Sequence, residues 1–145
     1  MDTEETMAVK GYLNVQIYRG GVLIDQWEDK NMILSVARSA LAALLGGAES
    51  GKVINRIGFG TSGTAPTPSD ATLTSSYVRS VGAITYPAAG QVRFAWSLAG
   101  SEANGKAIRE FGLICTDGTL FSRKVRGAIE KESDISLTGT WTISF

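Results

Sequence analysis

The sequence of 145 residues contains no histidine. This removes the commonest general base, the Ser–His and Cys–His nucleophile pairs and the ligand of most zinc sites. There is one cysteine, Cys115, so an internal disulfide is excluded and the fold must be stable in a reducing compartment. Because Cys115 lies at the end of a predicted strand, on the same face as Phe111 and Leu113, we expect a buried thiol that packs as a small apolar residue. We therefore predict a protein that is not an enzyme and that has no catalytic, cofactor-binding or metal-binding residues.

Long apolar runs are also missing. Residues 1–10 are acidic and polar and lack the apolar stretch of a signal peptide, and no segment approaches the roughly 18 apolar residues of a membrane span. We therefore expect no membrane partner and a location in a cytoplasm, or in a particle assembled there. For the polar arm 1–10 two interpretations stay open: it becomes ordered on contact with a partner, or it is idle.

An excess of positive charge is absent, because 14 Lys and Arg residues balance 14 Asp and Glu residues. Nucleic-acid-binding proteins usually carry a clustered positive excess, so we expect no nucleic-acid partner. The one basic cluster is formed by Arg123, Lys124 and Arg126, which we interpret as a solvated face of a strand. A net charge near zero also suits a protein that assembles with partners.

The composition that remains is that of one globular domain, residues 1–145, with 43% apolar and 19% charged residues. Alternating or apolar segments separated by turn residues predict a mainly β fold. Two turns favour β-hairpins: Gly20–Gly21, and Asp117–Gly118. The predicted strands are 12–18, 22–27, 53–59, 78–86 (one strand, or two broken at Gly82), 91–98, 107–115, 119–125 and 135–145.

The final strand, 135–145, has the clearest pattern in the chain. One face carries apolar side chains at alternate positions, from Ile135 through Trp141 to Phe145, and Gly139 on that face suggests a bulge. No charged tail protects this strand, and a free apolar edge favours aggregation. We therefore expect it to be paired on both sides, within the sheet or against another subunit.

One helix is predicted, after a cap at Asp29 or Asn31 and before Gly46–Gly47. Its apolar residues fall on one continuous stripe, which indicates an amphipathic helix packed on a sheet. The residues of that stripe are Ile33, Val36, Ala37, Ala40, Leu41, Leu44 and Leu45. Together these features predict a single-domain antiparallel β-sandwich, or a flattened barrel, with one helix packed on it.

Two patterns resemble a nucleotide-binding motif and a hydrolase site, but both are better explained as structural features of the fold. Gly58, Gly60 and Gly63 match a GxGxxG motif, but Pro66 and Pro68 follow where a nucleotide site needs the start of a helix. We interpret residues 60–70 as a surface loop, idle or in contact with a neighbouring subunit. Paired carboxylates of a hydrolase have candidates, yet all lie in turns, at strand edges or near basic residues. These candidates are Glu102, Glu110, Asp117, Glu130, Glu132 and Asp134, with Asp70 as a further turn residue. For Glu110 we expect a cross-strand ion pair with Arg123 or Lys131.

The order of motifs resembles that of bacteriophage tail-fibre, baseplate and tail-tip modules. Residues 54–73 (INRIGFGTSGTAPTPSDATL) resemble a strand ending in Gly-x-Gly-Thr, a Pro/Thr/Ser loop and an Asp-x-x-Leu step. Residues 104–125 (NGKAIREFGLICTDGTLFSRKV) are similar to an Ile-x-Glu-x-Gly-Leu, Asp-Gly-x-Leu, Arg hairpin, and residues 129–145 to a closing Trp-x-Ile-x-Phe strand. The resemblance implies a structural virion protein, usually a homo-oligomer, with other phage virion proteins as partners.

Three functions follow as hypotheses. The first is a non-catalytic virion subunit of a phage tail tip, baseplate or fibre-attachment region, which acts by subunit–subunit binding. The second is a capsid decoration (cement) protein. The third is a carbohydrate-binding module for receptor recognition, for which exposed tyrosines would supply the contacts. The tyrosines are Tyr12, Tyr18, Tyr77 and Tyr86, whereas Trp27, Trp96 and Trp141 are expected to face the core.

Overall fold

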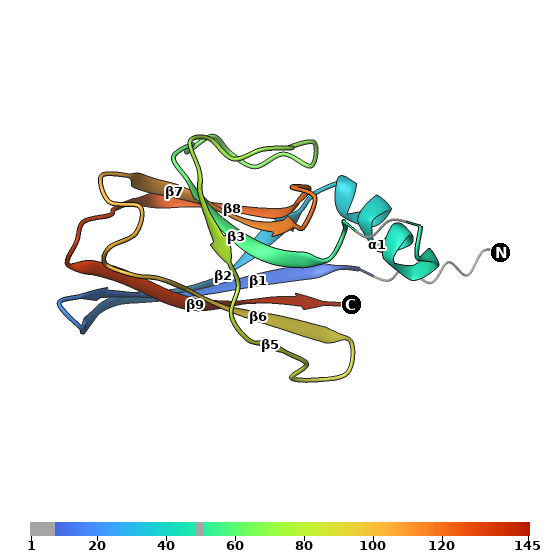
Figure 1. The fold of residues 1–145 in the computed structure, drawn as a ribbon, viewed down its shortest axis with the longest axis horizontal. Helices are drawn as coiled ribbons and strands as arrows, with labels where there is room; N and C mark the ends of the chain where they lie inside the picture. The colour runs from blue at the N-terminus through green and yellow to red at the C-terminus, as the bar shows by residue number, and fades with distance from the viewer. Residues whose placement is uncertain (1–7, 49–50) are drawn as a thin grey trace.

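The protein is described by a computed structural model, which covers residues 8–48 and 51–145. It is mainly β, as predicted: a single antiparallel sheet of nine strands curls strongly into a half-barrel, and one short helix lies at its end (Figure 1). Along the sheet the strands follow the order β4-β3-β7-β8-β2-β1-β9-β6-β5. The elements are β1 (Lys10–Arg19), β2 (Val22–Ile33), α1 (Val36–Gly46), β3 (Ile54–Gly60), β4 (Tyr77–Ser80), β5 (Ile84–Thr85), β6 (Gln91–Leu98), β7 (Ala107–Cys115), β8 (Leu120–Glu130) and β9 (Ile135–Ser144).

The two edges of the sheet approach each other at the segment between β4 and β5. The Val81 N–H donates to the Asn55 carbonyl near the start of β3, and the Gly82 N–H donates to the Ala95 carbonyl in β6. Because β3 and β6 belong to opposite parts of the curled sheet, this segment bridges the opening between them. The predicted segment 78–86 therefore forms two short strands, one at each edge of the sheet.

The final strand is central, as expected. β9 pairs with β1 on one side and with β6 on the other, and Trp141 and Leu137 are fully buried. The predicted bulge at Gly139 is wrong, because both registers run without interruption through this position. Glycine is needed there for space: a Cβ atom would lie 2.0 Å from the Asn14 carbonyl oxygen and 2.5 Å from the Trp96 indole.

The predicted start of the helix is also wrong. Asp29, Asn31 and Ile33 belong to β2, and the helix begins at Val36 after Ser35, whose side chain makes no capping hydrogen bond. The strand continues because its end pairs with β8, and the Leu34 N–H then donates to the Phe121 carbonyl. The helix ends at Gly46 and is capped by Gly47, as the sequence indicated.

The apolar stripe of the helix is buried only in part. Ala37 and Ala40 are buried in the core, whereas Leu44 is 41% exposed and Leu45 is 91% exposed. The helix lies at one end of the sheet, beside β8, so its last turn extends past the strands (Figure 1). Residues 1–7 of the predicted polar arm lie outside the described residues, and Lys10 already begins β1.

Candidate functional site: an apolar cavity at one end of the sheet

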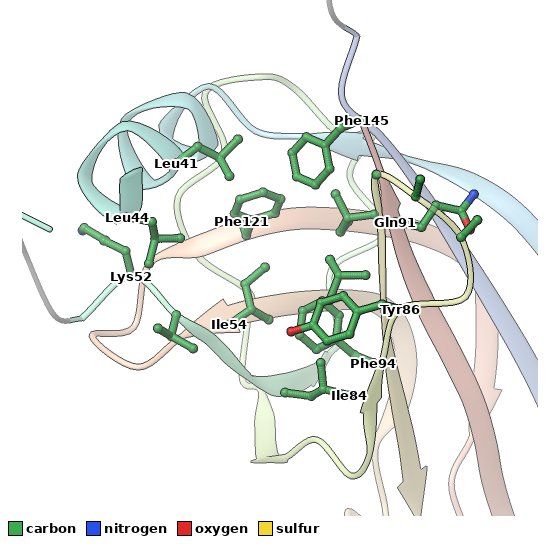
Figure 2. A pocket seen from close by; sticks show the side chains of 16 residues that line it. Leu41, Leu44, Lys52, Ile54, Ile84, Tyr86, Gln91, Phe94, Phe121 and Phe145 are labelled. Carbon is green, nitrogen blue, oxygen red and sulfur yellow. The ribbon is translucent and has the colours of Figure 1, made fainter. Parts of the chain in front are cut away.

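An open cavity of about 590 Å³ lies at the end of the half-barrel where α1 and the carboxyl end of β9 meet (Figure 2). Its walls come from segments far apart in the sequence, so only the curl of the sheet brings them together. The lining residues share an apolar character and include Leu41 and Leu44 of α1, Ile54 of β3, Ile84 of β5, Val92 and Phe94 of β6, Phe121 of β8, and Ile143 and Phe145 at the end of the chain.

The turn between β5 and β6 holds one side of this cavity in place. The Gln91 N–H donates to the Ala88 carbonyl, and the Phe145 N–H donates to the Gly90 carbonyl, both within 3.1 Å. The turn is therefore fixed to the last residue of the chain. Tyr86, which precedes the turn, stands at the rim with its ring toward the opening (Figure 2).

The rim exposes large apolar side chains to solvent. Tyr86 is 76% exposed, and the others lie between 41% and 50%: Leu44, Val53, Ile84 and Phe145. Contiguous exposed apolar surface of this kind usually marks a binding surface in a soluble protein. An apolar cavity at the mouth of a curled sheet is also a common place for binding.

The cavity is lined mainly by apolar side chains. Among the described residues that line it, Lys52 carries the one charged side chain, and its Nζ lies 2.6 Å from Asp117 Oδ2 and 3.1 Å from Thr119 Oγ1. The hydrogen bond from Lys52 holds the pKa of Asp117 well below its usual range. This ion pair therefore connects the segment just before β3 to the β7–β8 turn. The cavity suits the burial of apolar groups.

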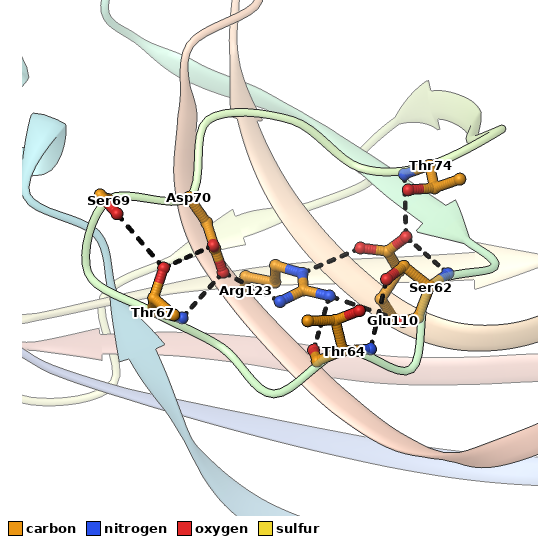
Figure 3. A network of polar contacts seen from close by, with 8 residues as sticks. All are labelled: Ser62, Thr64, Thr67, Ser69, Asp70, Thr74, Glu110 and Arg123. Carbon is orange, nitrogen blue, oxygen red and sulfur yellow. Dashed lines mark hydrogen bonds and ion pairs between the residues drawn. The ribbon is translucent and has the colours of Figure 1, made fainter.

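A second group of candidate residues forms a buried polar network on the other side of β8 (Figure 3). Glu110 and Arg123 are 0% and 3% exposed, and Arg123 Nε donates to Glu110 Oε1 over 2.9 Å. The expected pairing of Glu110 with Arg123 is thus confirmed. The interpretation of Arg123 as part of a solvated basic face is wrong, because its guanidinium also lies 2.9 Å from Asp70 and 3.1 Å from the Thr64 carbonyl.

This network fastens the loop that follows β3. Glu110 Oε2 accepts the N–H groups of Ser62 and Thr74, at 2.9 and 2.8 Å. Hydrogen bonds from the backbone and hydroxyl of Thr67 lower the pKa of Asp70, with a contribution from Arg123. The loop 61–76 is therefore tied to the sheet at several points by two buried charges.

The GxGxxG segment is not followed by the helix start that a nucleotide site needs. β3 ends at Gly60, and the described chain continues as a loop without a helix. A Cβ atom at Gly60 would lie 2.5 Å from Glu110 Oε2, and one at Gly58 would lie 2.7 Å from Leu73. Gly60 therefore leaves room for the buried carboxylate, and Gly58 leaves room for the Leu73 side chain.

The remaining acidic candidates do not lie together. Burial raises the pKa of Glu102, but hydrogen bonds from the Ala99 N–H and the Tyr77 hydroxyl outweigh it and lower the pKa overall. Asp134 pairs with Arg19 at 3.3 Å, while Glu130 and Glu132 are exposed. Within residues 8–48 and 51–145, no cluster of acidic or cysteine side chains is arranged to hold a metal ion.

Cys115 and Lys131 are buried without forming a reactive site. Burial raises the pKa of the Cys115 thiol to about 11, so the thiolate is disfavoured. Burial also lowers the pKa of Lys131, whose Nζ donates to the Gly100 and Glu132 carbonyls and to Asn104 Oδ1. Both therefore contribute to packing and loop attachment.

The four tyrosines do not gather on one surface. Tyr12 and Tyr18 lie near opposite ends of β1, and Tyr77 lies on the edge strand β4, where its hydroxyl donates to Glu102. Only Tyr86 borders the cavity. Trp96 and Trp141 are buried as expected, and Trp27 is half-buried with the Arg126 guanidinium 4.1 Å above its ring.

Sequence reasoning missed the cavity itself. One signal was present: the apolar stripe of the helix includes Leu41 and Leu44, which line the cavity, and Leu44 is 41% exposed. No described helix has the length and apolar character needed to cross a membrane.

Comparison with known proteins found no matching family model, no similar curated protein and no similar solved structure.

Proposed function

We propose that this chain is a non-catalytic structural subunit of a bacteriophage virion, located in a tail tip, baseplate or fibre-attachment region. It acts by binding neighbouring protein subunits. The observation that carries the binding role is the apolar cavity with its exposed apolar rim. The placement in a phage tail rests on the resemblance of the ordered motifs in residues 54–73, 104–125 and 129–145.

Apolar side chains of a neighbouring subunit are the occupant that fits this cavity best. The lining offers apolar contacts almost throughout, and its one charge is already paired with Asp117. The volume exceeds that of one side chain and lies in the range of roughly 300–1,000 Å³ found for binding pockets. Burial of the exposed rim residues would supply the binding energy, at about 25 cal/mol per Å² of apolar surface removed from water.

The experiment is to locate the protein in purified particles. Antibodies against the purified chain should label the tails of phage particles after heads and tails are separated. Label on heads would indicate capsid decoration, and a chain absent from purified particles would contradict the proposal. A phage that encodes Tyr86→Asp should produce particles with less of the protein, because the substitution places a charge at the cavity rim. Val78→Asp is the matched control, since Val78 is 38% exposed on β4 and lies outside the cavity.

A further inference from the structure

The end of the molecule opposite the cavity carries an exposed apolar projection. The hairpin between β1 and β2 turns at Gly20–Gly21, and the next three residues, Val22, Leu23 and Ile24, are 65%, 45% and 52% exposed. Such a run on a strand end is unusual for a protein surface that contacts only water. This hairpin tip, residues 20–24, therefore also has the character of a binding surface.

The hairpin tip and the cavity lie at opposite ends of the same strands. In the β1–β9 register Arg19 pairs with Ile135 at one end, and Lys10 pairs with Ser144 at the other. The tip follows Arg19, whereas the cavity contains Phe145, so the ten residues of β9 separate them. At about 3.3 Å per residue this separation is roughly 30 Å. Figure 1 shows the tip at the left and α1 with the carboxyl terminus at the right.

The hairpin tip is narrow, and its turn is hydrogen-bonded to the segment before β9. The two turn glycines have φ values of 55° and 80°, which favour glycine, and a Cβ atom at either would meet no other atom within 4 Å. The Gly20 N–H donates to the Asp134 carbonyl over 2.9 Å, and Arg19 pairs with the Asp134 carboxylate. Because the backbone of the tip is already ordered in the free chain, its insertion into a cavity would cost little conformational entropy.

From these features we infer that the hairpin tip of one copy of the chain inserts into the apolar cavity of a second copy. The inference rests on the proposed function and names the neighbouring subunit as another copy. Three apolar side chains behind a bare glycine turn fit an apolar cavity of about 590 Å³. The contact is heterologous, because the tip and the cavity lie on different surfaces of the molecule. After two copies bind, one still has a free cavity and the other a free tip, so further copies can add to form a ring or a filament.

The experiment uses the full chain and two variants, each with one altered surface. Leu23→Asp alters the tip and Tyr86→Asp alters the rim, and both positions are exposed enough for the fold to persist, which circular dichroism checks. The wild-type protein should increase in mass with concentration in sedimentation velocity. Each variant alone should associate at least about tenfold more weakly. Val78→Asp should associate like the wild type.

The decisive sample is the equimolar mixture of the two variants. It should form a 1:1 heterodimer and nothing larger, because the intact tip of Tyr86→Asp meets the intact cavity of Leu23→Asp. If tips paired with tips or cavities with cavities, one variant would dimerise alone and the mixture would show no new species, which would overturn the inference. A wild-type chain that stays monomeric would also overturn it.

These outcomes are separate from those of the proposed function. A monomeric chain that is nevertheless found in purified tails would leave the structural role intact and refute self-insertion. A chain that assembles tip to cavity but is absent from particles would refute the virion role and support the inference. Ile24→Asp repeats the test at a second position of the tip.

Discussion

Replacing Arg123 with methionine removes the central cation of the buried network and keeps most of the apolar volume of the side chain. Glu110, which is 0% exposed, then loses its ion-pair partner at 2.9 Å. Asp70 loses the same partner, which also lies at 2.9 Å. Two backbone N–H groups still bond Glu110 Oε2, so the carboxylate stays anchored but its charge is uncompensated. Removal of one partner of a buried ion pair typically costs about 3–5 kcal/mol.

The free energy of unfolding should therefore fall by about 3–5 kcal/mol in Arg123→Met. Glu110→Gln should cost less, about 1.5–3 kcal/mol, because Asp70 still balances the charge of Arg123. Urea unfolding monitored by tryptophan fluorescence measures both values, since two of the three tryptophans are buried. The matching fall in melting temperature for Arg123→Met is roughly 6–20 °C.

Arg19→Met is the matched control for this prediction. Its partner Asp134 lies at 3.3 Å, but both side chains are more than half exposed, so the pair contributes about 0–1 kcal/mol. If Arg123→Met unfolded within 1 kcal/mol of the wild type, as Arg19→Met should, the network would not stabilise the fold and the reasoning would be refuted. Loss of the loop attachment without global unfolding would appear as faster amide exchange in residues 61–76.

Three further outcomes are expected. Gly139→Ala should destabilise the protein by about 1–3 kcal/mol or more in thermal melts, because the added Cβ would overlap the Asn14 carbonyl. In the control Gly127→Ala the added Cβ meets no atom within 4 Å, so the stability should stay within about 0.5 kcal/mol of the wild type. Cys115 should react with a thiol reagent at pH 8 only after unfolding in guanidinium, and reaction at the rate of a free thiol in the native protein would contradict its burial. Because the folded-state pKa of that thiol is raised from 9.0 to about 11, unfolding should become easier as the pH rises between these values, and a Cys115→Ala variant should lose this part of the pH dependence.

The strands were predictable because their signal is local. Alternation of apolar residues identified β1, β6 and β9, and turn dipeptides identified the hairpins at Gly20–Gly21 and Asp117–Gly118. The boundary between β2 and α1 was not predictable in this way. Residues 29–33 fit a helix start locally, but residues 29–31 continue the pairing with β1. Met32 and Ile33 then pair with β8, some 90 residues later.

The site depends on contacts that a sequence does not display. Arg123 stands in a basic cluster in the sequence, and its burial follows from partners that lie 13 and 53 residues away, Glu110 and Asp70. The cavity likewise arises where α1, the β5–β6 turn and the end of β9 meet. Its position depends on the order of strands in the sheet, and alternation alone does not determine that order.

The most direct test of insertion of the hairpin tip into the cavity is a photo-cross-link from the cavity rim. A benzophenone amino acid in place of Tyr86, which is 76% exposed at the rim, should cross-link to whatever enters the cavity when the purified protein is irradiated at assembling concentrations. We predict a cross-linked dimer whose joined peptide contains Val22, Leu23 or Ile24 of a second copy. A chain that yields no dimer, or one joined at other positions, would contradict it.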